Sequence, residues 1–394
     1  MDFTFSPEQE ALREAVRSYL TKATPPTYVR EMIEDSRGFR DAWWEGIVEL
    51  GWPGLVVPEA LGGVGLGMVD LVVVQEEMGR LAMPGPFLSS AVCATIAARR
   101  LGDEELMTSL ASGRVRGTLA LEEVGAGDPL LSVTATATET PAISTFAATS
   151  APQATSAAAP VTPAATAAQT LGGWTLHGTK PVVIDGHTAD VAIVAARTDE
   201  GMAAFALDAP SGQLVGALDV TRKVARVDLE GRTARRLGPE GDQRGVLERV
   251  NDDIAVALCA ESVGASERAL HMAIEYSKAR VQFDRPIATF QAIKHKIVDM
   301  LHQLELARVG THWAAWASQV DDEQRGAAAA MCKGFVGEAA NMITAENIQV
   351  HGGVGFTWDV DCHLLFRRVK QNDVLFGRQG WQRQRLADLV LGPA

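Results

Sequence analysis

The hydrophobic periodicity of the chain changes twice along its 394 residues, and this limits the folds that it can adopt. Apolar residues first recur at helical spacing. They then give way to short runs of β-branched residues separated by Gly, Asp and Thr, a pattern typical of strands and turns. Long helical patterns return afterwards. The order predicts a helical domain over residues 1–117, a central β domain over 118–237 and a second helical domain over 245–394.

The first helix has a recognisable start. Ser6 can act as the N-cap, Pro7 suits the first helical position, and Gln9 can reach back to the cap backbone. The spacing of the next apolar residues predicts one apolar helix face, formed by Leu12, Val16, Tyr19 and Leu20.

A run of low complexity interrupts the β domain at residues 133–170. It consists mostly of Ala, Thr, Ser and Pro and carries almost no charge. Because such side chains offer little apolar surface to offset the entropy of ordering the chain, we expect a loop or a disordered insertion.

Composition excludes several classes of function. A net charge of −13 argues against a nucleic-acid-binding protein and against binding to an anionic membrane surface. The N-terminal residues resemble neither a signal nor a transit peptide, and no segment is apolar enough to span a bilayer. The cysteines are scattered, which favours reduced thiols and a cytoplasmic location; they are Cys93, Cys259, Cys332 and Cys362.

The stretch "SKARVQFDRPIATFQAIKHKIVDM" joins two helical patterns through a turn of unusual composition. Arg280 lies at the end of the first pattern, Phe283 follows three residues later, and Pro286 prevents continuation of the helix. Arg280 could simply cap the last carbonyl groups of the helix. Alternatively, its guanidinium could bind a diphosphate while the aromatic ring contacts a flat ring system. The residues alone leave both interpretations open.

A second glycine-rich stretch, "QVHGGVGFTWDVD", follows another helical pattern. Gly352, Gly353 and Gly355 could form a helix C-cap and an irregular exit. They could also let the backbone approach a ligand closely, because no Cβ atom stands in the way.

Taken together, the order of the motifs resembles the acyl-CoA dehydrogenase family over nearly the whole chain. The motifs are "LGWPGLVVPEALGGVG", "QEEMGR", "RVQFDRPIATFQAIKHK" and "QVHGGVGF". The resemblance implies an α+β fold with an N-terminal helical domain, a central β-barrel or sandwich domain and a C-terminal four-helix bundle. It also implies FAD as cofactor, an acyl-CoA substrate, a homomeric or heteromeric dimer or tetramer of homologous subunits, and an electron-transferring flavoprotein as electron acceptor.

The resemblance assigns cofactor contacts residue by residue. Arg280 and Phe283 match the positions that meet the FAD diphosphate and adenosine of a neighbouring subunit. Gln349, Gly352 and Gly353 match the positions that approach that cofactor from the other side.

The chain departs from the family pattern at both positions that usually carry the catalytic base. The family reaction removes an α proton with a carboxylate while the β hydrogen leaves as hydride to the flavin. The residue that matches the usual base is Phe376, and the alternative base position holds Ile254. Asp253 is adjacent to Ile254, and Glu261 lies two turns further along the helical pattern. Either could serve as the base if the substrate lay differently, although both are more typical of ordinary helix residues. No catalytic residue is therefore assigned.

The flavin face departs as well. Where the family has Thr and Ser serving the flavin and the substrate, this chain has Glu122 and Asp128. Val182 and Ile184 replace an aromatic and a hydroxyl residue. A Glu that faces the flavin pyrimidine would disfavour the anionic reduced flavin unless it is protonated or turned away.

Two hypotheses of function follow. The chain is an active FAD-dependent dehydrogenase with an unrecognised base, or it is a non-catalytic or half-site subunit that lends clamp residues to a homologous catalytic chain. An oxidase or monooxygenase on the same fold is a third class. His295 and His302 lack further ligands for a metal, so no metal site is expected. Neither a Rossmann fingerprint nor a hydrolase nucleophile elbow is present.

Overall fold

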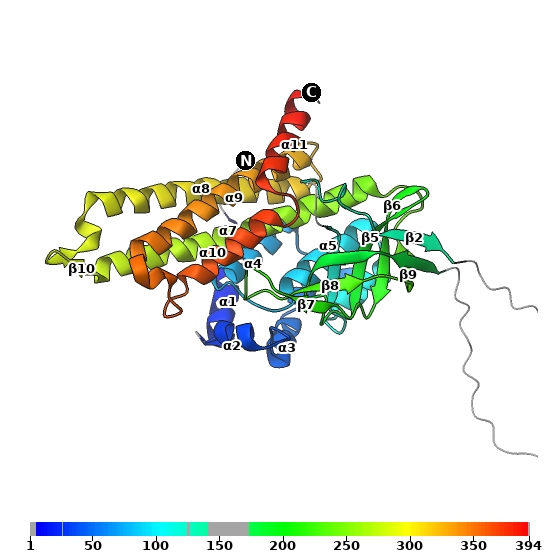
Figure 1. Ribbon diagram of the computed structural model, residues 1–394, viewed down its shortest axis with the longest axis horizontal. Coiled ribbons are helices and arrows are strands. Elements are labelled where there is room, and N and C mark those ends of the chain that lie inside the picture. The colour runs from blue at the N-terminus through cyan, green and yellow to red at the C-terminus, as the bar shows by residue number, and fades with distance from the viewer. Residues whose placement is uncertain (1–4, 26, 124–126, 141–172, 393–394) are drawn as a thin grey trace, which may run out of the picture.

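The computed structural model describes residues 5–25, 27–123, 127–140 and 173–392. Helices, then strands, then long helices follow one another along the chain, as the periodicity predicts. In Figure 1 the long helices extend to one end of the molecule, the strands gather at the other, and the first three helices lie below. The expected α+β fold class is therefore confirmed.

The N-terminal part is helical and begins with the expected capping box. The Ser6 hydroxyl accepts a hydrogen bond from the Gln9 N–H at 3.3 Å, and the Gln9 side chain accepts one from the Ser6 N–H at 3.1 Å. Val16 and Leu20 are buried on the predicted face. The helices are α1 (Pro7–Ala23), α2 (Tyr28–Glu34), α3 (Asp41–Glu49), η1 (Trp52–Gly54), η2 (Glu59–Leu61), α4 (Met68–Arg80), the π-helical η3 (Phe87–Ala94), α5 (Thr95–Leu101) and α6 (Glu104–Ala111).

The central strands form a closed barrel with a small second sheet. Strands β5, β2, β3, β9 and β6 pair in a ring, and β1 adds to β5 in parallel; β4, β8 and β7 form the second sheet. Closure leaves few unpaired strand edges. The strands are β1 (Gly117–Ala120), β2 (Thr136–Glu139), β3 (Trp174–His177), β4 (Thr179–Ile184), β5 (Val191–Thr198), β6 (Gly201–Asp208), β7 (Gln213–Val215), β8 (Val224–Asp228) and β9 (Arg232–Leu237).

Strand β2 shows that the prediction of a loop over residues 133–170 was wrong at its beginning. Val133, Ala135 and Ala137 are buried, and threonines alternate with them. This period of two suits a strand with one buried face, and small side chains suffice because β3 pairs closely alongside. The rest of the run, from residue 141, lies outside the described residues.

The C-terminal part is a bundle around one long buried helix, α7. From Leu247 to Ser266 nearly every α7 side chain is buried, so this helix has almost no face exposed to solvent over that length. The elements are α7 (Arg244–Ala279), β10 (Val281–Gln282), β11 (Arg285–Pro286), η4 (Ile287–Thr289), α8 (Gln291–Gln319), α9 (Arg325–His351), η5 (Gly352–Phe356), α10 (Cys362–Val374) and α11 (Gln379–Leu391).

Two glycines bring α7 against α4, and this contact ties the N-terminal helices to the bundle. A Cβ atom on Gly264 would lie 1.8 Å from the carbonyl oxygen of Glu76. One on Gly79 would lie 1.9 Å from the carbonyl oxygen of Glu261. The helix backbones therefore touch at a distance that only glycine permits.

Two further expectations concern chemistry and location. All four cysteines are buried and none forms a disulfide, as their scattered positions predict. Within the part of the chain that the structure describes, we find no helix with the length and apolar character needed to cross a membrane.

Candidate functional site

The turn between α7 and α8 leaves an aromatic ring in solvent. Strands β10 and β11 pair Gln282 with Arg285, so Phe283 and Asp284 form a two-residue hairpin with φ of 54° and 62°. Positive φ is uncommon for residues other than glycine. The Phe283 side chain is 86% exposed and meets only the edge of the Phe290 ring, with centroids 6.1 Å apart. Figure 1 shows this turn, labelled β10, at the end of the molecule farthest from the strands.

Arg280 lies at the C-terminus of α7, directly before this hairpin. Its backbone N–H caps the helix by donating to the Tyr276 carbonyl at 2.8 Å. Its side chain is exposed and forms no ion pair with another described residue. The capping interpretation therefore involves only the backbone, and the guanidinium remains available to an anion.

The "HGG" stretch forms the exit from α9. Gln349 is exposed on the last turn, and Gly352 caps the helix with φ of 64°. A Cβ atom on Gly352 or Gly353 would meet nothing within 4 Å, so their backbone faces open space. The geometry permits the close approach of a ligand to the main chain.

An aromatic pair joins the two candidate binding segments. Tyr276, one turn before Arg280, stacks on His351, which directly precedes Gly352; the ring centroids are 4.3 Å apart. The structure thus places both segments at the same end of the molecule, so that a single ligand could contact both of them.

The two positions of the expected base both carry buried apolar side chains. Phe376 is 4% exposed and has a φ of 56°, directly before Gly377. Ile254 is fully buried on α7. The Asn251 side chain, one turn before Ile254, donates to the Phe376 carbonyl at 3.5 Å. The two positions therefore face the same region, and neither offers a carboxylate.

The two alternative carboxylates are held by arginines. Asp253 accepts from Arg100 at 2.7 Å and from the Ser318 hydroxyl. Glu261 accepts from Arg222 at 2.5 Å and from Arg368 at 2.6 Å. Although burial by itself raises the pKa of Glu261, the two guanidinium charges lower it to about 2. A carboxylate with so low a pKa is a weak proton acceptor at neutral pH.

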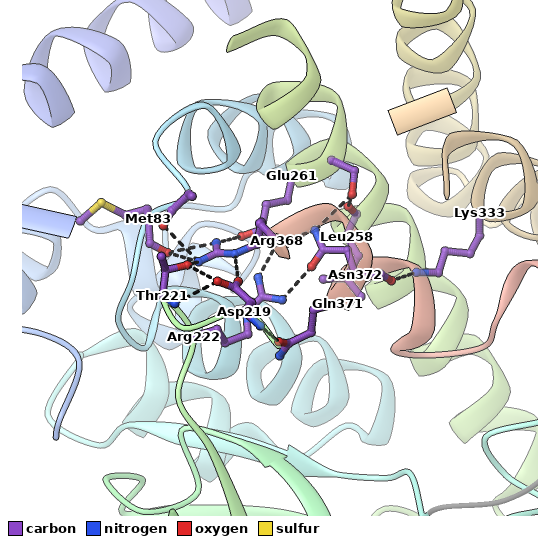
Figure 2. Close-up of polar contacts among 12 residues, drawn as sticks. Met83, Asp219, Thr221, Arg222, Leu258, Glu261, Lys333, Arg368, Gln371 and Asn372 are labelled. Carbon is purple, nitrogen blue, oxygen red and sulfur yellow. Dashed lines mark hydrogen bonds and ion pairs between the residues drawn. The ribbon is translucent and has the colours of Figure 1, made fainter. Parts of the chain in front are cut away.

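Figure 2 shows the buried network in which Glu261 takes part. The Arg368 guanidinium also binds the Asp219 carboxylate, donates to the Thr221 hydroxyl at 2.6 Å, and reaches the Met83 carbonyl. Asn372 bridges Arg222 and Glu261. Because each charge has an oppositely charged partner and further hydrogen bonds, the network satisfies the conditions for burying charges.

This network fills the interior between α4, α7 and α10. The cavity beside it has a volume of only about 10 Å³, room for one water molecule. It is lined by Gln75, Thr221, Arg222 and Glu261 among others, and the buried Gln75 amide has no hydrogen-bond partner among the described residues. This part of the interior has no space for an acyl chain.

Comparison with known proteins agrees with the geometry. The family description "Acyl-CoA dehydrogenase, N-terminal domain" matches residues 6–117, and "Acyl-CoA dehydrogenase, C-terminal domain" matches residues 252–391. The chain belongs to the acyl-CoA dehydrogenase family. FAD is the cofactor of this family, and its activity is oxidation of acyl-CoA thioesters.

Similar proteins within this family cover the whole chain. Acyl-CoA dehydrogenase IpdE2 from Mycobacterium tuberculosis is 30% identical over 365 residues, which are 92% of this chain and 91% of that protein. The ChsE4–ChsE5 complex from Mycobacterium tuberculosis has a chain with 28% identity, a TM-score of 0.82 and full coverage of both chains. A variant described as a steroid acyl-CoA dehydrogenase, Tcur3481–Tcur3483, has 28% identity and a TM-score of 0.82, covering 98% of each chain.

Glu122 is a carboxyl group whose surroundings sequence reasoning did not anticipate. Burial raises the pKa of its carboxyl to about 7, in opposition to the charge of Lys333 and to the backbone N–H groups of Phe376 and Gly377. Those N–H groups belong to the turn where this family usually carries its base. Glu122 is half-buried, and its carboxyl lies against this turn.

Lys180 positions the segment that carries Glu122. Its buried ammonium donates to the Leu121 carbonyl at 3.2 Å and to the Glu123 carboxylate at 2.7 Å. These bonds hold the Leu121 backbone and the Glu123 side chain on the two sides of Glu122. No local sequence pattern predicts the contact with the turn at Phe376, because the two segments are more than 250 positions apart.

Asp128, at the family's Ser position, also forms contacts that stabilise the local structure. One carboxylate oxygen accepts from the Leu130 N–H at 2.8 Å, and the other meets Arg244 at 3.2 Å. Val182 is partly buried and Ile184 is buried on β4, so neither supplies a polar group to the flavin face.

Proposed function

We propose that this chain is one subunit of an FAD-dependent acyl-CoA dehydrogenase, and that it binds the cofactor through Arg280, Phe283, Gln349, Gly352 and Gly353. In the assembled enzyme the reaction is α,β-dehydrogenation of an acyl-CoA thioester. Bound FAD supplies the hydride acceptor. The observation that carries the proposal is the clamp, which lies at one end of a chain of this family. It combines a guanidinium that has no ion-pair partner among the described residues, an exposed ring and an open glycine backbone.

The residues present suit the diphosphate end of the cofactor. An arginine guanidinium binds phosphate oxygens through paired N–H groups, and Arg280 is exposed for this purpose. The open backbone at Gly352 and Gly353 offers close approach. The exposure of Phe283 fits a clamp that is completed by a second subunit.

We further propose that the catalytic carboxylate comes from a homologous partner chain. Phe376 and Ile254 offer none, and Asp253 and Glu261 are neutralised by arginines. The interior beside Glu261 is filled by the ion-pair network. Two of the similar structures are described as pairs of chains, ChsE4–ChsE5 and Tcur3481–Tcur3483, which supports a heteromeric assembly.

One observation favours the second candidate, an active homomeric enzyme. Glu122 lies at the turn of Phe376 and has a pKa of about 7, close to the value that suits a general base at neutral pH. In this candidate Glu122 takes the α proton that the missing carboxylate would otherwise accept.

An electron-transferring flavoprotein is the proposed electron acceptor in either case. One similar protein is named as a subunit of a caffeyl-CoA reductase–Etf complex and is 25% identical over 98% of this chain. The proposed location is cytoplasmic.

The FAD content of the chain purified alone separates the two candidates. Near-zero flavin in a folded protein supports the partner-subunit proposal, and co-expression with a homologous chain should then restore flavin. About one FAD per chain together with acyl-CoA dehydrogenase activity supports the homomeric enzyme.

The clamp itself is tested in the flavin-containing assembly by Arg280→Ala. We expect loss of FAD on gel filtration, since a charge-assisted diphosphate contact is removed. Arg285→Ala is the matched control: Arg285 lies in the same hairpin, but its guanidinium packs over the Phe290 ring at 4.3 Å. Unchanged FAD occupancy in Arg280→Ala would remove the clamp assignment.

A further inference from the structure

An open pocket of about 290 Å³ lies between the turn at Asp128 and helices α7 and α11. Glu248, Asn251 and Asp252 come from one face of α7, and Trp381 and Asp388 come from one face of α11. We call this pocket the acidic groove. Its location matters because the family's Ser, which serves the substrate, is replaced here by Asp128.

Carboxylates outnumber cations in the acidic groove. Arg385 is committed to Asp252, which it binds with both terminal nitrogens. Arg244 is shared between Asp128 at 3.2 Å and Glu248 at 3.0 Å, so one arginine serves two acids.

The remaining charges around the groove do not restore the balance. Among the described residues, the Asp388 carboxylate accepts a hydrogen bond from the neutral amide of Gln384 at 2.8 Å and has no cationic partner. Arg325, on α9 behind Asp252, is itself paired with Asp321 at 3.2 Å. The groove therefore keeps an excess of negative charge.

A buried acceptor without a partner lies in the same groove. Asn251 is 2% exposed and lines the groove, and its side-chain oxygen has no hydrogen-bond partner among the described residues. A buried carbonyl oxygen without a donor is costly. A ligand that brings N–H groups would satisfy this oxygen.

We propose that the acidic groove binds the ammonium or guanidinium group of a lysine or arginine from a partner polypeptide, and that it excludes the phosphates of CoA. The excess of carboxylates over arginines supplies the charge complementarity, and the Asn251 oxygen accepts one N–H. The CoA moiety is a polyanion, and like charges at such close range oppose its entry.

The inference rests on the proposed function and extends it. If the acidic groove repels CoA, the thioester binds to another chain of the assembly. The acidic groove is then a docking site for that chain and not an entrance for the substrate.

The test compares three probes on the full chain: a fluorescent peptide with two lysines, the same peptide with two glutamates, and CoA. We expect the lysine peptide to bind about tenfold tighter than the glutamate peptide, and CoA not to bind at millimolar concentration. A saturable 1:1 complex of the unmodified chain with CoA, or equal affinity for both peptides, would overturn the inference.

Two variants locate the effect in the groove. Asp128→Asn with Glu248→Gln should weaken lysine-peptide binding about tenfold, whereas Glu49→Gln with Glu59→Gln, which removes two exposed charges elsewhere, should leave it unchanged. Asn251→Leu keeps the groove charge and should still weaken the peptide severalfold. Equal losses in the groove and control variants would overturn the inference.

Failure of this inference is distinguishable from failure of the proposed function. The probes report on the groove alone, whereas FAD retention in Arg280→Ala reports on the clamp at the opposite end of α7. CoA binding with an intact clamp would reject only the acidic groove.

Discussion

The Arg368 guanidinium donates to the Glu261 carboxylate at 2.6 Å and thereby joins α10 to α7 inside the bundle. Both side chains are almost completely buried, and Arg222 holds the other carboxylate oxygen. The result is a charged interior between α4, α7 and α10, in a family whose substrates carry an acyl chain. The same contacts that stabilise the bundle therefore also remove Glu261 from acid–base chemistry.

Glu261→Gln should lower the free energy of unfolding by about 3 kcal/mol, because two buried guanidinium groups lose their shared counter-charge. Chemical denaturation monitored by circular dichroism measures this. Glu275→Gln, at an exposed position of the same helix, is the control and should change stability by less than about 0.5 kcal/mol. Similar values for the two variants would contradict the assignment of Glu261 as the centre of the network.

Glu122 should make the protein less stable as the pH rises from about 4.5 to about 7. In the unfolded chain this carboxyl ionises near its ordinary pKa of about 4.3, whereas in the folded protein its pKa is about 7. Within that window the folded state holds the extra proton, so the free energy of unfolding falls with increasing pH.

Glu122→Gln removes this pH dependence and should raise stability at pH 8 by about 3 kcal/mol relative to its effect at pH 4.5. Denaturation curves at several pH values measure the difference. Glu105→Gln, an exposed acid on α6, should show none. A constant difference between wild type and Glu122→Gln across the window would show that the carboxyl is ionised throughout.

Phe376→Glu should not create dehydrogenase activity on its own. The new carboxylate would stand at a turn whose N–H groups already face Glu122, and two acids in one buried site oppose each other's ionisation. The double variant with Glu122→Thr restores the family residues at both places. Activity in the double variant but not in Phe376→Glu would support this account, and a substantial gain in Phe376→Glu alone would show that only the base had been lost.

Gly264→Ala should destabilise the protein by about 3 kcal/mol, since its Cβ atom would overlap the Glu76 carbonyl of α4. Gly245→Ala, on the same helix with nothing within 4 Å, should be neutral or stabilising by up to about 1 kcal/mol. Thermal unfolding of the two variants measures the contrast. Equal effects would mean that the α4–α7 contact can relax at little cost.

The helical and β parts of the fold could be predicted from the sequence because periodicity and caps are local properties. The Ser6–Gln9 capping box and the start of the β pattern needed only neighbouring residues. The strand at 136–139 was missed because alanine and threonine carry a weak pattern, and only pairing with β3 made that pattern sufficient for a strand.

The clamp motif was also visible in the sequence, since an arginine and an aromatic residue at a proline-containing turn are unusual. Its use was not. Only the structure shows that the Phe283 ring is left in solvent and that Tyr276 and His351 bring the glycine stretch to the same end. That these residues bind FAD is a proposal, and the Arg280→Ala variant tests it.

The sequence by itself determined the family, the order of helices and strands, and the absence of a carboxylate at positions 376 and 254, because these depend on residue identity and spacing. The tertiary structure alone decided which charges meet. Glu261 forms ion pairs with two arginines from distant segments. Glu122 lies at the turn at Phe376, and Asp128 lines the acidic groove. The strength of an ionic contact depends on distance and burial, and neither is encoded in any short stretch of the chain.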